Sequence, residues 1–254
     1  MEYVRAEYKD GYAVVTIERP PVNALNSPAY FELYQVFYQI ALEEKARVVI
    51  LTGAGQKAFV AGADVREFLD FDSETGMQFT AKNQHIREYL RTFPKPVICA
   101  VNGMALGGGC ALAMCCDTRL AAEHATFNLS EINMGIVGAI PYAAGIISQG
   151  TARRLVYSGE TITAEEALRV GLVDEVLPAA DLMPRCEALA RKMAEKPPLA
   201  LARAKACMVY ASEHLMADTA AFERRAIEAL WGTEDKNEAV RAFLEKRPPN
   251  FQGR

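Results

Sequence analysis

The stretch that decides the fold of this chain is N-G-M-A-L-G-G-G at residues 102–109, which follows the strand-like segment Pro96–Val101. An earlier turn of small residues, Ala61-Gly62-Ala63-Asp64, follows the apolar run Arg47–Thr52. Small residues let a backbone approach a ligand closely, with its amide N–H groups pointing outward. Two such turns that face one point would form an oxyanion hole, which stabilises negative charge on a carbonyl oxygen. For either turn alone, tight packing of a strand against a helix is the plainer interpretation.

The segments around these turns predict an α/β fold. A hairpin is expected from Val4–Tyr8 and Ala13–Glu18, and a helix is expected to begin with Ser27 as its cap and Pro28 in its first turn. A strand at Val48–Thr52 follows, and the alternation of strand and helix continues through Val101. This alternation is typical of parallel strands joined by helical crossovers.

The chain becomes mainly helical after Thr163. A capping box at Thr163–Glu166 predicts one helix, which Gly171 ends, and a short extended segment is expected at Leu172–Val176. Asp181 is expected to cap the next helix. The remaining helices are expected over Leu199–Tyr210, Ser212–Trp231 and Thr233–Lys246. We therefore divide the chain into a β/α core at residues 1–195 and a helical region at residues 196–254.

Composition narrows the class of protein. The chain has 254 residues, of which 51% are hydrophobic, and a net charge of −4 without a polybasic block, so nucleic acid is not an expected partner. Val97–Cys116 lacks charge, but its glycines favour a buried strand, turn and helix over a membrane span. The charged N-terminal residues do not resemble a secretory signal, so a cytoplasmic location without membrane contact is expected. The six cysteines are interpreted as buried free thiols, and the scattered histidines do not predict a metal site.

Several motifs, in a consistent order, resemble the enoyl-CoA hydratase/isomerase family, also called the crotonase superfamily. The motifs that carry the resemblance are Val22–Asn26, Lys57–Glu67, Asn102–Gly109, Cys116–Arg119, Gly171–Val176 and Phe243–Arg247. The resemblance implies a spiral of ββα turns with a C-terminal helical region that builds homotrimers, often paired into hexamers. It also implies an acyl-CoA thioester as the substrate, with coenzyme A arriving as part of that substrate and no separate cofactor.

The same resemblance assigns residues to the site. The N–H groups of Ala63 and Gly108 would form the oxyanion hole, and Glu131 in the motif Phe127–Ile136 would be the catalytic acid/base. Ala111 and Tyr142 would lie at the acyl pocket. The residues implied for binding coenzyme A are Ala24, Ala61, Asp64, Val65, Arg66, Phe243 and Lys246.

The chain departs from the family pattern at Ala111, where many family hydratases have a second glutamate. Migration of a double bond needs one proton-shuttling group, whereas hydration ordinarily uses an acid and a base. A lone Glu131 therefore favours an enoyl-CoA isomerase, with enoyl-CoA hydratase as the alternative. An acyl-CoA hydrolase, a decarboxylase and a non-catalytic acyl-CoA-binding protein are further possibilities. The pattern at Gly53–Ala58 loosely resembles a dinucleotide-binding loop, but no helix is expected to open at its glycines, which argues against a nicotinamide enzyme.

Overall fold

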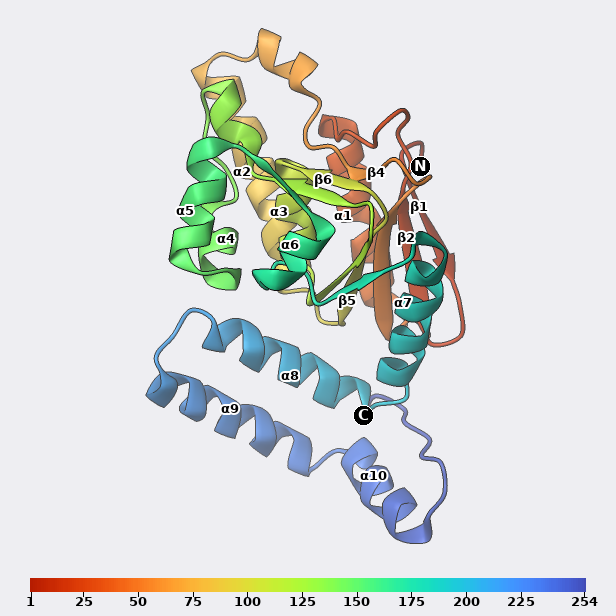
Figure 1. Ribbon diagram of the computed structural model, residues 1–254. Coiled ribbons are helices and arrows are strands. Elements are labelled where there is room, and N and C mark those ends of the chain that lie inside the picture. The colour runs from red at the N-terminus through yellow and green to blue at the C-terminus, as the bar shows by residue number, and fades with distance from the viewer.

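The computed structural model describes residues 1–254 and has an α/β architecture with two sheets (Figure 1). The larger sheet has the strand order β1-β2-β3-β5-β7-β10, and the smaller has the order β4-β6-β8-β9. Only the pairs β1–β2 and β8–β9 are antiparallel. The strands are β1 (Val4–Tyr8), β2 (Tyr12–Ile17), β3 (Val48–Gly53), β4 (Ala58–Val60), β5 (Val97–Val101), β6 (Met104–Leu106), β7 (Thr118–Ala122), β8 (Thr126–Asn128), β9 (Thr161–Thr163) and β10 (Glu175–Leu177).

The central parallel strands β3 and β5 are mostly apolar, as expected where both faces of a sheet are covered. Every residue of β3 and of β5 is buried. One face packs against α1, and the other packs against α7, which contacts β2, β3, β5 and β7. A parallel strand covered on both faces carries a continuous apolar run rather than an alternating one. The predicted parallel β/α core is therefore confirmed.

The helices surround the sheets and then extend below them (Figure 1). Helices α8 and α9 lie side by side beneath the core, with α10 beyond them. The helices are α1 (Ser27–Leu42), α2 (Ser73–Arg91), α3 (Gly108–Met114), α4 (Ile140–Ile146), α5 (Gln149–Ser158), α6 (Ala164–Arg169), α7 (Ala179–Ala194), α8 (Pro198–Ala211), α9 (Met216–Trp231) and α10 (Glu234–Glu245), with 3₁₀ turns η1 (Val65–Asp70) and η2 (Ser130–Met134). The division expected at residues 195–196 falls in the link between α7 and α8.

Some predicted boundaries were wrong. Helix α1 is capped by Asn26 rather than Ser27, because the Asn26 side chain accepts a hydrogen bond from Ala29 N at 3.0 Å. Helix α7 begins before Asp181, which lies inside its first turn. The last short strand starts at Glu175 rather than Leu172. Thr163 does cap α6, since its hydroxyl accepts from Glu166 N.

The strand and the buried helix predicted within Val97–Cys116 are found as β5 and α3, but the predicted turn between them also contains the short strand β6. None of the helices combines the length and the apolar character needed to cross a membrane. All six cysteines are free, and five of them are buried.

Glycines allow three segments to approach one another around β4. A Cβ at Gly109 would lie 1.9 Å from Val60 O, and one at Gly53 would lie 2.3 Å from Phe59 O. A Cβ at Gly103 would lie 2.6 Å from Lys57 O. Any larger residue would force the backbone apart at these positions. The loop after β3, the turn after β5 and the start of α3 therefore meet at β4 only because these residues are glycines.

Asn102 ties the same segments together through its side chain. Its Oδ1 accepts from Gly53 N at 3.2 Å, and its Nδ2 donates to Gly53 O at 2.7 Å and Gly55 O at 2.5 Å. The side chain thus cross-links the end of β3 to the turn after β5.

We predict that Asn102→Ala lowers the free energy of unfolding by about 2–3 kcal/mol, because it leaves buried backbone groups without partners. Urea denaturation followed by circular dichroism measures the change. A loss below about 0.5 kcal/mol, the size of an ordinary surface substitution, would contradict this role for Asn102.

Candidate active site

A cavity of about 210 Å³ lies between the two turns of small residues. Its floor includes Gly62 and Ala63 from the first turn and Gly107 and Gly108 from the second. Helix α2 contributes Phe79, Asn83 and Arg87 at spacings of one helical turn. The two turns predicted from sequence to face one point therefore do share a cavity. The remaining lining residues are Tyr30, Ala61, Val65, Phe68, Thr80, Leu106, Ser130, Glu131, Met134, Ile136, Val137 and Gly138.

The backbone amides of Ala63 and Gly108 have no acceptor within the chain. Neighbouring amides are used, since Asp64 N donates to Leu25 O and Gly107 N to Asn128 O, but neither Ala63 N nor Gly108 N donates a backbone hydrogen bond. A Cβ at Gly108 would lie 3.7 Å from Ala63 N, so the two amides are close. Gly108 also opens α3, where the first N–H groups are unpaired by geometry. The pair is thus available to an oxyanion.

Glu131 on η2 directs its carboxylate into this cavity. A Cβ at Gly107 would lie 3.5 Å from Glu131 Cδ, and one at Gly138 would lie 2.9 Å from Glu131 Oε1, so two glycines leave room for the side chain. Burial raises the pKa of Glu131, while its own backbone N–H and the charge of Arg87 lower it less strongly. Glu131 Oε2 is buried without a hydrogen-bond partner. A carboxylate in this setting is a stronger base than an exposed one.

Tyr30 on α1 is a site residue that the sequence analysis does not name. Its ring is buried, but its hydroxyl reaches the cavity, and a Cβ at Gly108 would lie 3.1 Å from Tyr30 Oη. Burial raises the pKa of Tyr30 to about 12, so the hydroxyl stays protonated at neutral pH. A tyrosine on a core-facing helix position could have indicated this role from sequence, because a buried tyrosine hydroxyl usually needs a polar partner.

The residues expected to bind coenzyme A fall into two groups. Ala61 and Val65 line the cavity, whereas Ala24 stands at its side, where its carbonyl accepts from Arg19 at 2.8 Å. Asp64 is buried and holds both Arg19 and Arg66 at 2.8 Å. These two guanidinium groups hold the pKa of Asp64 well below its usual range. Arg66 is largely exposed, although it pairs with Asp64.

Four other sequence-predicted residues lie outside the cavity lining. Ala111 is completely buried in α3, and Tyr142 is half-buried in α4 near Cys115. Phe243 at the end of α10 and Lys246 just after it are exposed on the surface, away from the cavity. Within one chain, the structure does not bring Phe243 or Lys246 to Glu131.

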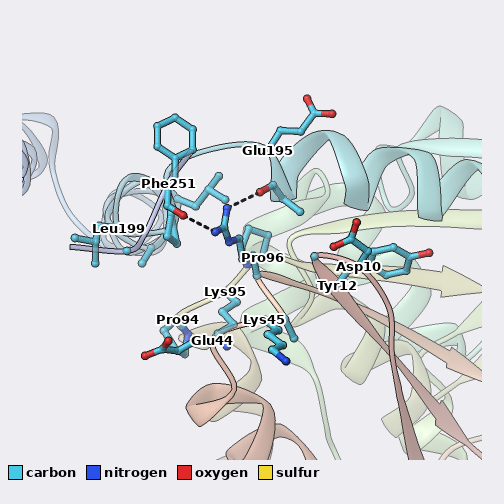
Figure 2. Close-up of a pocket in the computed structure, with 18 of the residues that line it drawn as sticks. Asp10, Tyr12, Glu44, Lys45, Pro94, Lys95, Pro96, Glu195, Leu199 and Phe251 are labelled. Carbon is cyan, nitrogen blue, oxygen red and sulfur yellow. Dashed lines mark hydrogen bonds between the residues drawn. The ribbon is translucent and has the colours of Figure 1, made fainter. Parts of the chain in front are cut away.

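A larger hollow of about 1120 Å³ lies between the core and the C-terminal region (Figure 2). Lys45 and Lys95 lie on its core side, and Leu199 and Phe251 on its C-terminal side. The Arg47 guanidinium donates to Ala194 O at 3.2 Å and to Phe251 O at 2.7 Å. Lys95 Nζ donates to the carbonyls that end α1. These contacts fasten the C-terminal tail to the core, and the hollow lacks the paired free amides of the smaller cavity.

Two free amides beside a buried glutamate can bind an oxyanion while the carboxylate moves a proton. The chain belongs to the enoyl-CoA hydratase/isomerase family of the crotonase superfamily, because residues 7–254 match the model of that family, described as "Enoyl-CoA hydratase/isomerase". The fold class predicted from sequence is confirmed by the same comparison and by solved structures.

Several hydratases are similar to this chain in sequence or structure. The chain is 38% identical to a short-chain-enoyl-CoA hydratase of Clostridium acetobutylicum over 239 residues, which is 92% of each chain. It is 38% identical to the 2,3-dehydroadipyl-CoA hydratase of Escherichia coli over 248 residues, which is 95% of each chain. A crystal structure of an enoyl-CoA hydratase from Bacillus anthracis has a TM-score of 0.95 and 34% identity, with full coverage of both chains.

We predict that Glu131→Gln raises the thermal unfolding temperature at neutral pH. The pKa of Glu131 is raised in the folded state, so ionised Glu131 costs stability at every pH above that folded pKa, and glutamine removes this cost. The advantage of the variant should vanish below about pH 4, where both states of the wild type are protonated. Differential scanning calorimetry between pH 4 and 8 measures it, and a variant that is less stable at neutral pH would count against a destabilised carboxylate.

We predict that Gly108→Pro lowers turnover by about 100- to 1,000-fold, because proline cannot donate a hydrogen bond to the oxyanion. Circular dichroism must first show a native-like fold, since the substitution also alters the turn. A folded variant with normal turnover would remove Gly108 from the oxyanion hole.

Proposed function

We propose that this protein is an enoyl-CoA hydratase, which adds water across the double bond of a 2-enoyl-CoA. The observation that carries the proposal is the buried Glu131 carboxylate, with a free oxygen, in the same cavity as the unpaired amides of Ala63 and Gly108. The sequence alone favours isomerisation, because Ala111 stands where many family hydratases have a second glutamate. The named relatives instead support hydration.

One carboxylate is sufficient for both proton transfers of the hydration reaction. Glu131 accepts a proton from water as the water oxygen bonds to C3, and the π electrons move onto the thioester oxygen as an enolate. The Ala63 and Gly108 amides bind that enolate oxygen. Glu131 then returns the proton to C2, and the enolate collapses to the 3-hydroxyacyl-CoA. One group thus acts first as base and then as acid.

Tyr30 adds a donor that stays neutral throughout this cycle. Its high pKa makes it a poor proton donor, but its hydroxyl near Gly108 supports a third hydrogen bond to the enolate oxygen or to the water. In this role it would help to stabilise the enolate, but it would not replace the proton-transferring glutamate that family hydratases have at the position of Ala111.

Exposed large apolar residues on the C-terminal helices support an assembly of copies. Leu215, Met216, Trp231 and Phe243 are each more than three-fifths exposed. Aromatic residues and methionine are enriched at protein contacts relative to the rest of the surface. We infer a homotrimer or a dimer of trimers, which light scattering after size exclusion would test.

We predict that the wild type hydrates crotonyl-CoA faster than it shifts the double bond of a 3-enoyl-CoA, and that Glu131→Gln lowers the hydration kcat by about 100- to 10,000-fold. Steady-state assays with both substrates at equal concentration measure the ratio. Faster isomerisation than hydration would replace the hydratase proposal with the isomerase one. Hydration that survives in Glu131→Gln would remove Glu131 as the base.

A further inference from the structure

Arg87 is a charged side chain in the cavity that the hydration reaction does not use. It projects from α2 and lines the cavity, and its Nε is buried without a hydrogen-bond partner. Arginine stays protonated in proteins, so this is a fixed positive charge with an unused donor. A buried donor without a partner is costly and calls for an explanation.

Arg87 and Glu131 are the only charged residues that line the cavity, yet they do not form an ion pair. Each keeps an unpartnered buried atom, Nε in one and Oε2 in the other. The charge of Arg87 still lowers the pKa of Glu131, so the two groups are near each other. Glu131 Oε2 is the acceptor for water in the proposed reaction, which leaves Arg87 open to a different group.

Arg87 lies near groups at both ends of α3. Its charge lowers the pKa values of Cys115 and Tyr142, and also that of Tyr30 beside Gly108, opposing the larger effect of burial on each. Cys115 ends α3, the helix that Gly108 begins. Seven residues of helix span about 10 Å, so the groups near Arg87 extend from the oxyanion amides to the far end of α3.

The bulky coenzyme A moiety needs an opening to solvent, whereas Arg87 Nε and the nearby Cys115 are buried. We therefore take the far end of a short acyl chain, rather than coenzyme A, as the part of the substrate that meets Arg87. An alkyl terminus there would leave the arginine donor unpaired, whereas a carboxylate could accept from it.

We propose that Arg87 binds a carboxylate at the far end of the acyl chain, so that the protein prefers short enoyl-CoAs whose acyl group is a dicarboxylic acid joined to coenzyme A at one end. This inference rests on the proposed hydratase function for its reaction, but not for its binding. Arg87 sets specificity, while Glu131 and the two amides perform the chemistry.

The direct test is binding of two saturated ligands that differ only at the acyl terminus. Isothermal titration calorimetry of adipyl-CoA and hexanoyl-CoA compares a carboxylate with a methyl group on chains of equal length. We expect the wild type to bind adipyl-CoA about 10- to 100-fold more tightly, as a charge-assisted hydrogen bond would give. Equal affinity, or tighter binding of hexanoyl-CoA, would overturn the inference whether or not the protein is a hydratase.

Two variants separate the role of Arg87 from general damage. Arg87→Met should abolish the preference for adipyl-CoA, while Arg91→Met should keep it. Arg91 is a matched control because it lies one turn further along α2, where it pairs with Glu88 and Glu213 outside the cavity. If Arg87→Met lowers the affinity for adipyl-CoA and for hexanoyl-CoA by the same factor, Arg87 has a structural role and the inference is overturned.

Turnover provides a readout at the reaction itself. We expect the kcat/KM ratio of 2,3-dehydroadipyl-CoA to 2-hexenoyl-CoA to exceed about 10 in the wild type and to fall below 1 in Arg87→Met. Because the two substrates are compared within each protein at one pH, a change in the ionisation of Glu131 affects both substrates and cancels from the ratio. The methyl ester of 2,3-dehydroadipyl-CoA, which keeps the length but loses the charge, should behave as 2-hexenoyl-CoA does. If the kcat/KM for the ester equals that for the free carboxylate, recognition by charge is contradicted.

Discussion

The close approach of Gly109 to the Val60 carbonyl is the constraint on which the site depends. With any side chain at Gly109, α3 could not begin where it does against β4. The start of α3 carries the Gly108 amide, and the chain after β4 carries the Ala63 amide. Two donors that come from separate crossovers are therefore brought together by backbone packing rather than by side chains. Such donors are preorganised, and they need no rearrangement when charge develops on the substrate.

The groups that line the cavity between these donors lower the stability of the folded protein. Burial raises the pKa of Glu131, and the same burial leaves Glu131 Oε2 and Arg87 Nε without partners. Elsewhere the chain pairs its buried charges, as Asp64 does with Arg19 and Lys205 with Asp117. The contrast marks the cavity as the place where substrate, rather than protein, completes the hydrogen bonds.

The sequence predicted the central strands β3 and β5 because they are apolar runs that lead into glycine-rich turns. The strands of the smaller sheet were missed, because three residues are too few to show a strand pattern. Boundaries were missed where a neighbouring residue competed for the same role, as Asn26 did with Ser27 at the cap of α1. Ala63, Gly108 and Glu131 were found from motifs, and the structure brings them to one cavity. Tyr30 and Arg87 were missed, because helical periodicity shows which face a residue is on but not which tertiary cavity its polar end enters. The choice between hydration and isomerisation could not come from the lone Glu131, since both reactions place negative charge on the thioester oxygen and both need a carboxylate that moves a proton.

The central claim is that the free amides of Ala63 and Gly108 polarise a thioester carbonyl beside Glu131. The most direct measurement is the infrared C=O stretch of crotonyl-CoA, labelled with ¹³C at the thioester carbon and bound to Glu131→Gln, which should hold the substrate with little turnover. Two convergent hydrogen bonds weaken the carbonyl bond, so the account predicts a stretch at lower frequency in the complex than in water. A stretch at the same or higher frequency than in water would show that no oxyanion hole acts on the substrate, and would contradict the account.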